Sequence, residues 1–327
     1  MYRIVALISI FFFLLGCKQG SNTTPTPTPP VTQTGWVKLK PFPGGKRSYG
    51  TAFTINGVAY VCSGINYTNS NITGYNDLWQ YNPANDSWTQ KTNIPYMYTP
   101  NDGRRNAFSF VIGGQAYVGG GITATGIGGT DIIGYDPLSN QWTSKNKLSN
   151  GQFSISFGTS YKNIGYILSL IGSDYVMYTY NPSSNQIVQT SFMGTYSWCV
   201  GASDRLLLGE GIPDVAVYTP GSSVGTFLAL YNSTAGYFSI DGTSVFSQPI
   251  IYNNNIYQSF GDLGKLFRFD LTTNAWDKIP LTNTTLNIKE GVVCFNIGSK
   301  LYVVGGSTND LHGQYTDAVW MIDLDHI

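Results

Sequence analysis

The chain has 327 residues, enough for one large all-β domain or two smaller ones. Charged residues make up only 11%, and 18 Lys and Arg balance 18 Asp and Glu. A neutral chain without a basic block gives no electrostatic reason to expect a nucleic-acid partner. The 23 Tyr and 38 Gly, with no long pattern of 3.6-residue periodicity, favour short strands joined by tight turns.

The first 17 residues have the pattern of a secretory signal. Arg3 precedes an apolar run from Ile4 to Leu15, and Gly16-Cys17 closes it. A Cys directly after Leu-Leu-Gly resembles the bacterial lipobox, which implies that Cys17 is lipidated and becomes the mature N-terminus. The alternative is an uncleaved membrane anchor, for which this run is short compared with the ~20 residues of a span.

Residues 18–34 form a Thr/Pro-rich tether. Such a segment cannot bury a core and stays extended, so it holds the following domain away from a membrane surface. Lys18 is not the Asp that usually retains lipoproteins at the inner membrane. We therefore expect a lipid-anchored protein of the bacterial cell envelope, in the outer membrane, on its periplasmic or its external side.

The remaining cysteines, Cys62, Cys199 and Cys294, lie in apolar, strand-like contexts. Their odd number, their wide spacing and the lack of a CxxC pair argue against a disulfide framework or a zinc site. We expect buried free thiols, with one bridged pair as the alternative.

From residue 35 the chain is built from repeats, and the clearest unit runs from Arg47 to Trp88. Asn56-Gly57 between two apolar runs predicts a hairpin, because both central residues of that turn need positive φ. Ser63-Gly64 ends the second strand. A third strand, 78–81, and a turn at Asn82-Pro83 then lead to the strand that carries Trp88.

Five less regular copies follow, and in most of them an aromatic residue precedes a Trp-like position by seven residues. The Trp-like positions are Trp36, Trp88, Trp142, Ile187, Phe238 and Trp276. In the fourth copy two segments compete for the third strand, 215–218 and 228–231. We prefer 228–231, because Phe238 lies seven residues after Tyr231, and this makes 211–225 an inserted loop.

The sixth copy lacks its Trp strand, whereas the domain begins with a spare one at Trp36. Six sets of strands are complete only if the strand of Trp36 joins the last set, which is how a ring of blades removes its own edges. The sequence therefore predicts an all-β, six-bladed propeller over 35–327. An all-β sandwich is the alternative, but it explains neither the seven-residue spacing nor the spare strand.

The Arg at the start of the unit, Gly-Gly after the second strand, Asn-Asp-Leu-Trp, Tyr-Asn-Pro and the spaced Trp together resemble the Kelch family of β-propellers. The resemblance covers nearly all of 35–327. Kelch propellers of the galactose oxidase type use copper held by two His and a Tyr-Cys pair. This chain has only His312 and His326, so copper chemistry of that kind is not expected, and we predict no metal and no cofactor.

Strand direction places the Arg positions and the loops that follow the Gly-Gly ends on one face of the propeller. The long loops 65–75, 122–130 and 307–316 belong to the first, second and sixth blades, which become neighbours when the ring closes. They carry Tyr67, Tyr75 and His312, and aromatic rings among Asn, Thr and Gly suit a glycan or a peptide. The alternative is that these loops only cover the propeller.

The starts of the first strands align as a ring that leans cationic: Arg47, Arg104, Gln152, Gly194, Ser244 and Lys289. Arg105 and Glu290 stand beside it. Arg forks suit a carboxylate or phosphate, although a Kelch-type Arg can also satisfy loop carbonyls between blades. Asp77, Asp131 and Asp317 open the third strands of the clear copies, and this repetition favours a structural hydrogen bond.

Two functions remain open. We favour a lipid-anchored binding module that recognises a glycan or a protein partner on the loop-rich face through Arg47, Arg104, Arg105, Lys289, Tyr67, Tyr75 and His312. The alternative is an enzyme similar to the bacterial sialic-acid mutarotases of the Kelch family, acting on an acidic sugar. In that case Glu290 or Glu210 is the candidate acid/base residue.

Overall fold

Residues of left-handed conformation close the hairpins that the sequence predicts. Asn56 and Gly57 have φ of 50° and 77°, and Gly113 and Gly114 have 59° and 76°. These turns join β2 (Thr51–Ile55) to β3 (Val58–Cys62), and β9 (Phe108–Ile112) to β10 (Gln115–Gly119). Each is an antiparallel pair in continuous register.

A computed structural model describes residues 35–68, 71–95, 103–148, 153–171, 174–190, 196, 198–210, 214–221, 226–229, 245–282, 286–308 and 314–327. They belong to one unit, Gln33–Ile327. The signal segment with Cys17 and the tether lie outside the described residues. No helix in the described ranges is long and apolar enough to cross a membrane.

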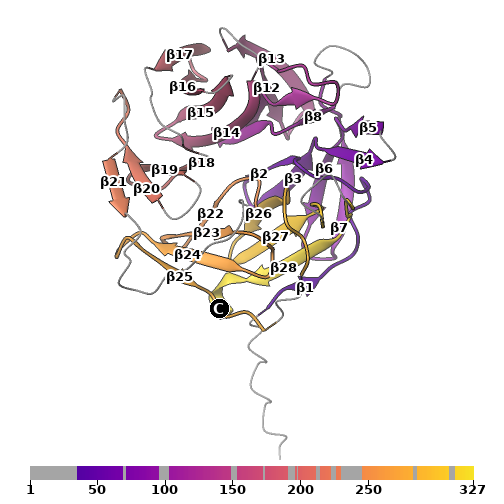
Figure 1. The fold of residues 1–327 in the computed structure, drawn as a ribbon. Coiled ribbons are helices and arrows are strands. Elements are labelled where there is room, and N and C mark those ends of the chain that lie inside the picture. The colour runs from indigo at the N-terminus through magenta and orange to yellow at the C-terminus, as the bar shows by residue number, and fades with distance from the viewer. Residues whose placement is uncertain are drawn as a thin grey trace, which may run out of the picture. The chain divides into compact units, whose positions relative to one another are not determined.

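Within these ranges the strands form six four-stranded antiparallel sheets, the blades of a β-propeller (Figure 1). Blade 1 is β2, β3, β6 (Leu78–Asn82) and β7 (Ser87–Lys91), and blade 2 is β9, β10, β12 (Asp131–Asp136) and β13 (Gln141–Lys147). Blade 3 is β14 (Phe153–Tyr161), β15 (Ile164–Ile171), β16 (Asp174–Asn181) and β17 (Gln186–Thr190). Blade 4 is β18 (Trp198–Gly201), β19 (Leu206–Glu210), β20 (Asp214–Tyr218) and β21 (Thr226–Ala229). Blade 5 is β22 (Ile250–Tyr252), β23 (Asn255–Ser259), β24 (Leu266–Asp270) and β25 (Ala275–Lys278).

Blade 6 confirms that the first strand of the domain closes the ring. It consists of β26 (Val293–Ile297), β27 (Lys300–Val304), β28 (Val319–Asp323) and β1 (Val37–Lys38). Val37 pairs with Met321 and Lys38 with Trp320, and Figure 1 shows β1 beside β28. Trp36 is buried, and its indole N–H donates to the carbonyl of Leu263 at 3.0 Å. A 3-10 helix, η2 (Leu324–His326), follows the last strand.

The seven-residue spacing has a simple structural meaning. Tyr81 lies directly opposite Trp88, Tyr135 opposite Trp142, and Phe269 opposite Trp276. Each pair links the third and fourth strands of its blade, which are joined by a four-residue connection, so the spacing marks a hairpin. Ile187 opposes Tyr180 in the same way, which confirms that it replaces a Trp in blade 3.

The preferred third strand of the fourth blade is wrong. Asp214–Tyr218 pairs with β19 as the third strand, and Leu228 lies in β21, the fourth. Only residues 211–213 separate β19 from β20, so the shorter connection forms the hairpin. The predicted partner Phe238 lies outside the described residues.

The hydrophobic core is divided into six clusters, each between two neighbouring blades. In three of these interfaces a Phe of the innermost strand stacks on a Tyr of the second strand, at centroid distances of 5.1–5.3 Å, and that Tyr contacts a Tyr of the next blade. The triplets are Phe53, Tyr60 and Tyr135; Phe110, Tyr117 and Tyr180; and Phe295, Tyr302 and Tyr81. The three cysteines that follow Cys17 are buried and free in these layers, as expected.

Two short ribbons stand outside the blades on the face predicted to carry the long loops. They are β4 (Ile65–Thr68) with β5 (Asn71–Gly74), and β8 (Arg104–Arg105) with β11 (Ile122–Thr123). The Gly64 N–H donates to the carbonyl of Arg104 at 2.7 Å, and the Gly306 N–H to that of Arg47 at 2.8 Å. In blades 1 and 6 the Gly-rich end of the second strand therefore lies beside the Arg of the next blade, on the same face.

Candidate functional site at the channel mouth

Three blades enter their innermost strand through the same three-residue pattern. The patterns are Arg47-Ser48-Tyr49 in blade 1, Arg104-Arg105-Asn106 in blade 2 and Lys289-Glu290-Gly291 in blade 6. The third residue of each has positive φ: 59°, 54° and 65°. The Tyr49 N–H donates to the carbonyl of Gly291, and the Asn106 N–H donates to the carbonyl of Tyr49. These bonds tie blades 6, 1 and 2 together at one end of the central channel.

The first residue of the pattern is part of the scaffold in blades 1 and 2. Arg47 bonds both oxygens of Asp77, at 2.6 and 2.7 Å, and Arg104 bonds both oxygens of Asp131, at 3.0 and 2.7 Å. The two Arg side chains are 0% and 3% exposed. Arg47 also donates to the carbonyls of Ser63 and Gly44. Asp77 and Asp131 thus have the structural role that their repetition favours.

Tyr75 covers the buried Arg47. Its ring centroid lies 4.1 Å from the guanidinium carbon, and its hydroxyl donates to the carbonyl of Lys46 at 3.2 Å. A cation over an aromatic face is stabilised by the ring quadrupole. In this structure Tyr75 is therefore engaged with the scaffold, at the edge of the mouth.

The second residue of the pattern supplies the charges of the mouth. Arg105 and Glu290 are half-buried and come from the blades on either side of Tyr49. Ser307 pairs with both Glu290 and Tyr315, so the loop before β28 brings Tyr315 next to this carboxylate. We call Tyr49, Arg105, Glu290 and Tyr315 the mouth cluster.

The two phenols of the mouth cluster are held neutral. Burial, a hydrogen bond with the Glu290 side chain and the charge of Glu290 raise the pKa of Tyr49 well above its usual range, against a smaller lowering by Arg105. Burial and the charge of Glu290 also raise the pKa of Tyr315, again opposed by Arg105. Tyr315 is 4% exposed, and its hydroxyl has no hydrogen-bond partner among the described residues. Glu290 therefore acts on both phenols of the mouth cluster.

Besides Arg47, Arg104 and Tyr75, which belong to the scaffold, the predicted site residues fall into three groups. Arg105 and Glu290 meet in the mouth cluster, and Tyr67, a half-buried residue of β4, lies close enough to interact electrostatically with Tyr315. The Lys289 N–H bonds the carbonyl of Ser307 at 2.8 Å beside the cluster. Glu210 ends β19 in blade 4 and is not part of the mouth pattern, and Cys17 and His312 lie outside the described residues.

Tyr49 was missed as a site residue. In the sequence it belongs to Arg-Ser-Tyr-Gly, which looks like the start of a repeat and nothing more. The signal for it was the alignment of the three blades. Asn106 and Gly291 occupy the equivalent positions and tolerate a left-handed backbone, which Tyr does not favour. Tyr315 lies in the predicted long loop 307–316, and no sequence pattern distinguishes it there.

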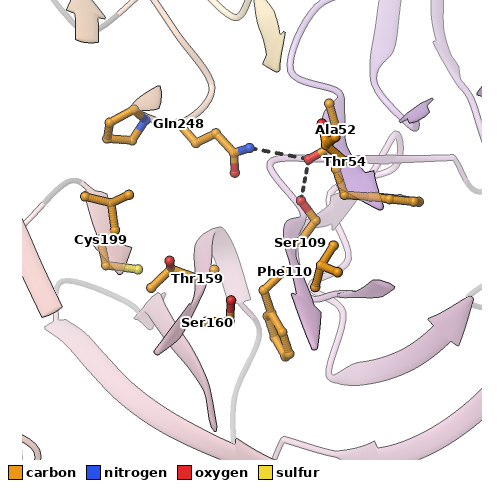
Figure 2. A pocket seen from close by; sticks show the side chains of 13 residues that line it. Ala52, Thr54, Ser109, Phe110, Thr159, Ser160, Cys199 and Gln248 are labelled. Atoms are coloured by element: carbon orange, nitrogen blue, oxygen red, sulfur yellow. Dashed lines mark hydrogen bonds between the residues drawn. The ribbon is translucent and has the colours of Figure 1, made fainter. Parts of the chain in front are cut away.

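A separate cavity of about 170 Å³ lies deeper in the channel (Figure 2). The Gln248 amide and the Ser109 hydroxyl both donate to the Ala52 carbonyl, at 3.3 and 2.8 Å. Among the described residues, the lining includes no Asp, Glu, Lys, Arg or His, and burial raises the pKa of its Cys199 thiol to about 12. A thiol that stays protonated is a poor nucleophile. The charged chemistry is therefore at the mouth and not in this cavity.

The fold and the mouth cluster define a six-bladed β-propeller with an Arg, a Glu and two phenols at one end of its channel. No family model matches the chain. The chain is similar to proteins named N-acetylneuraminate epimerase from Shigella sonnei (strain Ss046), Escherichia coli (strain K12) and Escherichia coli O6:K15:H31 (strain 536 / UPEC). Each is 36% identical over 88 residues, which is 27% of this chain and 23% of the relative. The match thus spans less than a quarter of the length of these curated relatives.

Proposed function

We propose that this propeller binds an acidic sugar of the N-acetylneuraminate type at the mouth cluster and interconverts its anomers. The observation that carries the proposal is the meeting of Arg105 and Glu290 around Tyr49, from three blades, on the face with the long loops. The limited similarity to proteins named N-acetylneuraminate epimerase supports the same choice. This reverses the order of the two functions that the sequence left open.

Arg105 is the anion partner in this proposal. A guanidinium offers paired N–H donors that match a carboxylate, and a charge-assisted bond is about twice as strong as a neutral one. Arg47 and Arg104 are less suited to this role, because each already holds an aspartate and neither is more than 3% exposed.

Glu290 is the acid/base residue. Its carboxylate takes the proton of the anomeric hydroxyl, the electron pair of that O–H bond forms a C=O bond, and the ring C–O bond breaks. The ring oxygen keeps the electron pair of the broken bond and takes up a proton. Closure on the other face of the carbonyl reverses these steps. No atom is gained or lost overall, and no electron is transferred.

We also propose that the domain is a Kelch-type propeller held in the bacterial envelope by a lipid on Cys17. The repeat residues and the lipobox pattern support this. Metabolic labelling with a radioactive fatty acid tests the anchor. Label in the wild-type chain that is lost in Cys17→Ser supports it, and equal label in both chains contradicts it.

The main experiment is NMR exchange spectroscopy of N-acetylneuraminate with the purified propeller. The proposal expects faster exchange between the anomers than in buffer, a loss of roughly 100-fold or more in Glu290→Gln, and weaker binding in Arg105→Met. Arg268→Met, which removes an exposed cation from blade 5, is the matched control. Exchange at the buffer rate with the wild-type protein rejects the enzyme.

A purely binding function is the second candidate. It is favoured by exposed apolar side chains on the segments that flank the mouth, Ile72 in β5 and Ile127 after β11, each 41% exposed. These side chains suit a glycan or protein partner that needs no chemistry. Saturable sugar binding without faster exchange supports this reading, and a wild-type rate that Glu290→Gln abolishes excludes it.

A further inference from the structure

Tyr49 has a backbone conformation that its residue type does not favour. Its φ of 59° lies in the left-handed region, where the equivalent positions of blades 2 and 6 carry Asn106 and Gly291. Asn and Gly tolerate this region, whereas for a bulky aromatic residue it is an outlier. Such outliers gather at functional sites, where the surrounding structure maintains them.

The backbone bonds of the ring do not need a tyrosine. The Tyr49 N–H donates to the Gly291 carbonyl at 2.8 Å, and its own carbonyl accepts from Asn106 at 2.9 Å. Asn106 takes part in the same way, donating to Tyr49 and accepting from Ser156 at 3.0 Å. An Asn therefore makes the equivalent bonds in blade 2, so the phenol of Tyr49 is not required for the scaffold.

The missing side chain of Gly291 makes room for the Tyr49 ring. A Cβ built on Gly291 would lie 3.0 and 3.1 Å from two ring carbons of Tyr49, and 2.0 Å from the Ser48 hydroxyl. The ring thus lies across the backbone that directly follows Glu290. The ring therefore leads toward Glu290, whose side chain is among the causes that raise the pKa of the Tyr49 phenol.

We propose that Tyr49 is a positioning residue that holds the Glu290 carboxylate in the direction in which it acts on the sugar. The inference rests on the proposed function. The left-handed backbone and the close approach to Gly291 aim the phenol from blade 1 at a residue of blade 6. Arg105 comes from blade 2 and also acts on the same phenol, where its charge opposes that of Glu290.

The test uses two variants of Tyr49 in the full chain. Tyr49→Phe keeps the ring on Gly291 and removes only the hydroxyl. Tyr49→Asn removes the ring as well and places a residue that favours this backbone conformation. Tyr81→Phe is the matched control, because it removes a phenol that bonds Asp86 at 3.0 Å in the turn between β6 and β7. Each protein is assayed for the exchange rate at saturating N-acetylneuraminate, for the Kd and for Tm.

We expect Tyr49→Phe to lower the exchange rate about 10- to 100-fold, the usual loss when an orienting partner is removed, with the Kd within threefold of wild type. Tyr49→Asn loses at least as much rate while its Tm stays level or rises, because backbone strain is relieved. Tyr81→Phe keeps the wild-type rate. Crystal structures of the wild type and of Tyr49→Phe should show a rotated Glu290 carboxylate in the variant.

Two results overturn the inference alone. One is an active wild type with Tyr49→Phe within twofold of its rate. The other is a rate loss matched by an equal loss of affinity, which would make Tyr49 a ligand contact and not a positioning residue. A wild type that does not speed exchange overturns the proposed function, and the inference falls with it.

Discussion

Arg104 and Arg105 are neighbours in one short strand, yet they belong to different parts of the molecule. Arg104 is buried against Asp131 of its own blade, and Arg105 is half-buried at the mouth, near Tyr49 and Tyr315. Successive residues of an extended strand point to opposite sides. One step along the chain therefore divides the scaffold from the candidate site.

The largest effect should come from breaking a buried pair on the scaffold side. Asp77→Ala leaves the fully buried Arg47 guanidinium without its carboxylate, and an uncompensated buried charge costs about 3–5 kcal/mol of unfolding free energy. Asp277→Ala is the matched control, because it removes the partner of Arg268 from a pair whose side chains are 36% and 50% exposed. That loss should be about 1 kcal/mol or less. Denaturant titration of both variants measures the difference, and similar losses would show that burial does not set the strength of these pairs.

The next largest effect concerns the glycines beside the buried arginines. Gly305→Ala places a Cβ 2.3 Å from the Arg47 carbonyl oxygen at a φ of 71°. Gly298→Ala has a φ of 57° in open space. A left-handed alanine alone costs about 1–2 kcal/mol. Because Gly305→Ala adds a clash to this cost, it should lower the free energy of unfolding by at least about 1 kcal/mol more than Gly298→Ala in the same titration. Equal losses would mean that blade 6 moves away from Arg47 without resistance.

Alkaline pH should weaken the scaffold through its buried thiols. Burial raises the pKa of Cys62 to about 12, against a lowering by a hydrogen bond with the Ser63 side chain. Because the folded pKa lies above the ordinary value of 9.0, the stabilisation is complete below pH 9 and is lost as pH rises through about 12. When the pH rises from 9 to 10, the unfolding free energy of the wild type should fall by roughly 1 kcal/mol more than that of Cys62→Ala. Urea titrations at the two pH values measure this, and parallel losses would place an ionised thiol in the folded protein.

The scaffold could be predicted from the sequence because its features repeat. Tyr81 and Trp88, Asn56-Gly57 and the spare strand of Trp36 each follow from local spacing, and the structure confirms them. Blade 4 was misread, because a better spacing match at Tyr231 competed with a shorter connection to Tyr218. The candidate site was harder to predict. Arg105 and Glu290 were singled out, but Tyr49 and Tyr315 join them only through contacts between blades, which no local pattern encodes.

The smallest effect on stability, and the sharpest test of the division, comes from Arg105. Arg105→Met should change the unfolding free energy by no more than about 0.5 kcal/mol, since the side chain is half-buried and leaves no buried aspartate without a partner. Arg104→Met, one residue earlier, removes the partner of Asp131 and should cost several-fold more. If Arg105 binds the sugar carboxylate, Arg105→Met should also weaken N-acetylneuraminate binding roughly 10- to 100-fold by calorimetric titration, the worth of a bond to a charged group. If Arg105→Met destabilises the protein as much as Arg104→Met and leaves binding unchanged, Arg105 has a structural role and does not bind the sugar. Adjacent variants that separate stability from binding would show that the alternation of the strand assigns the two roles.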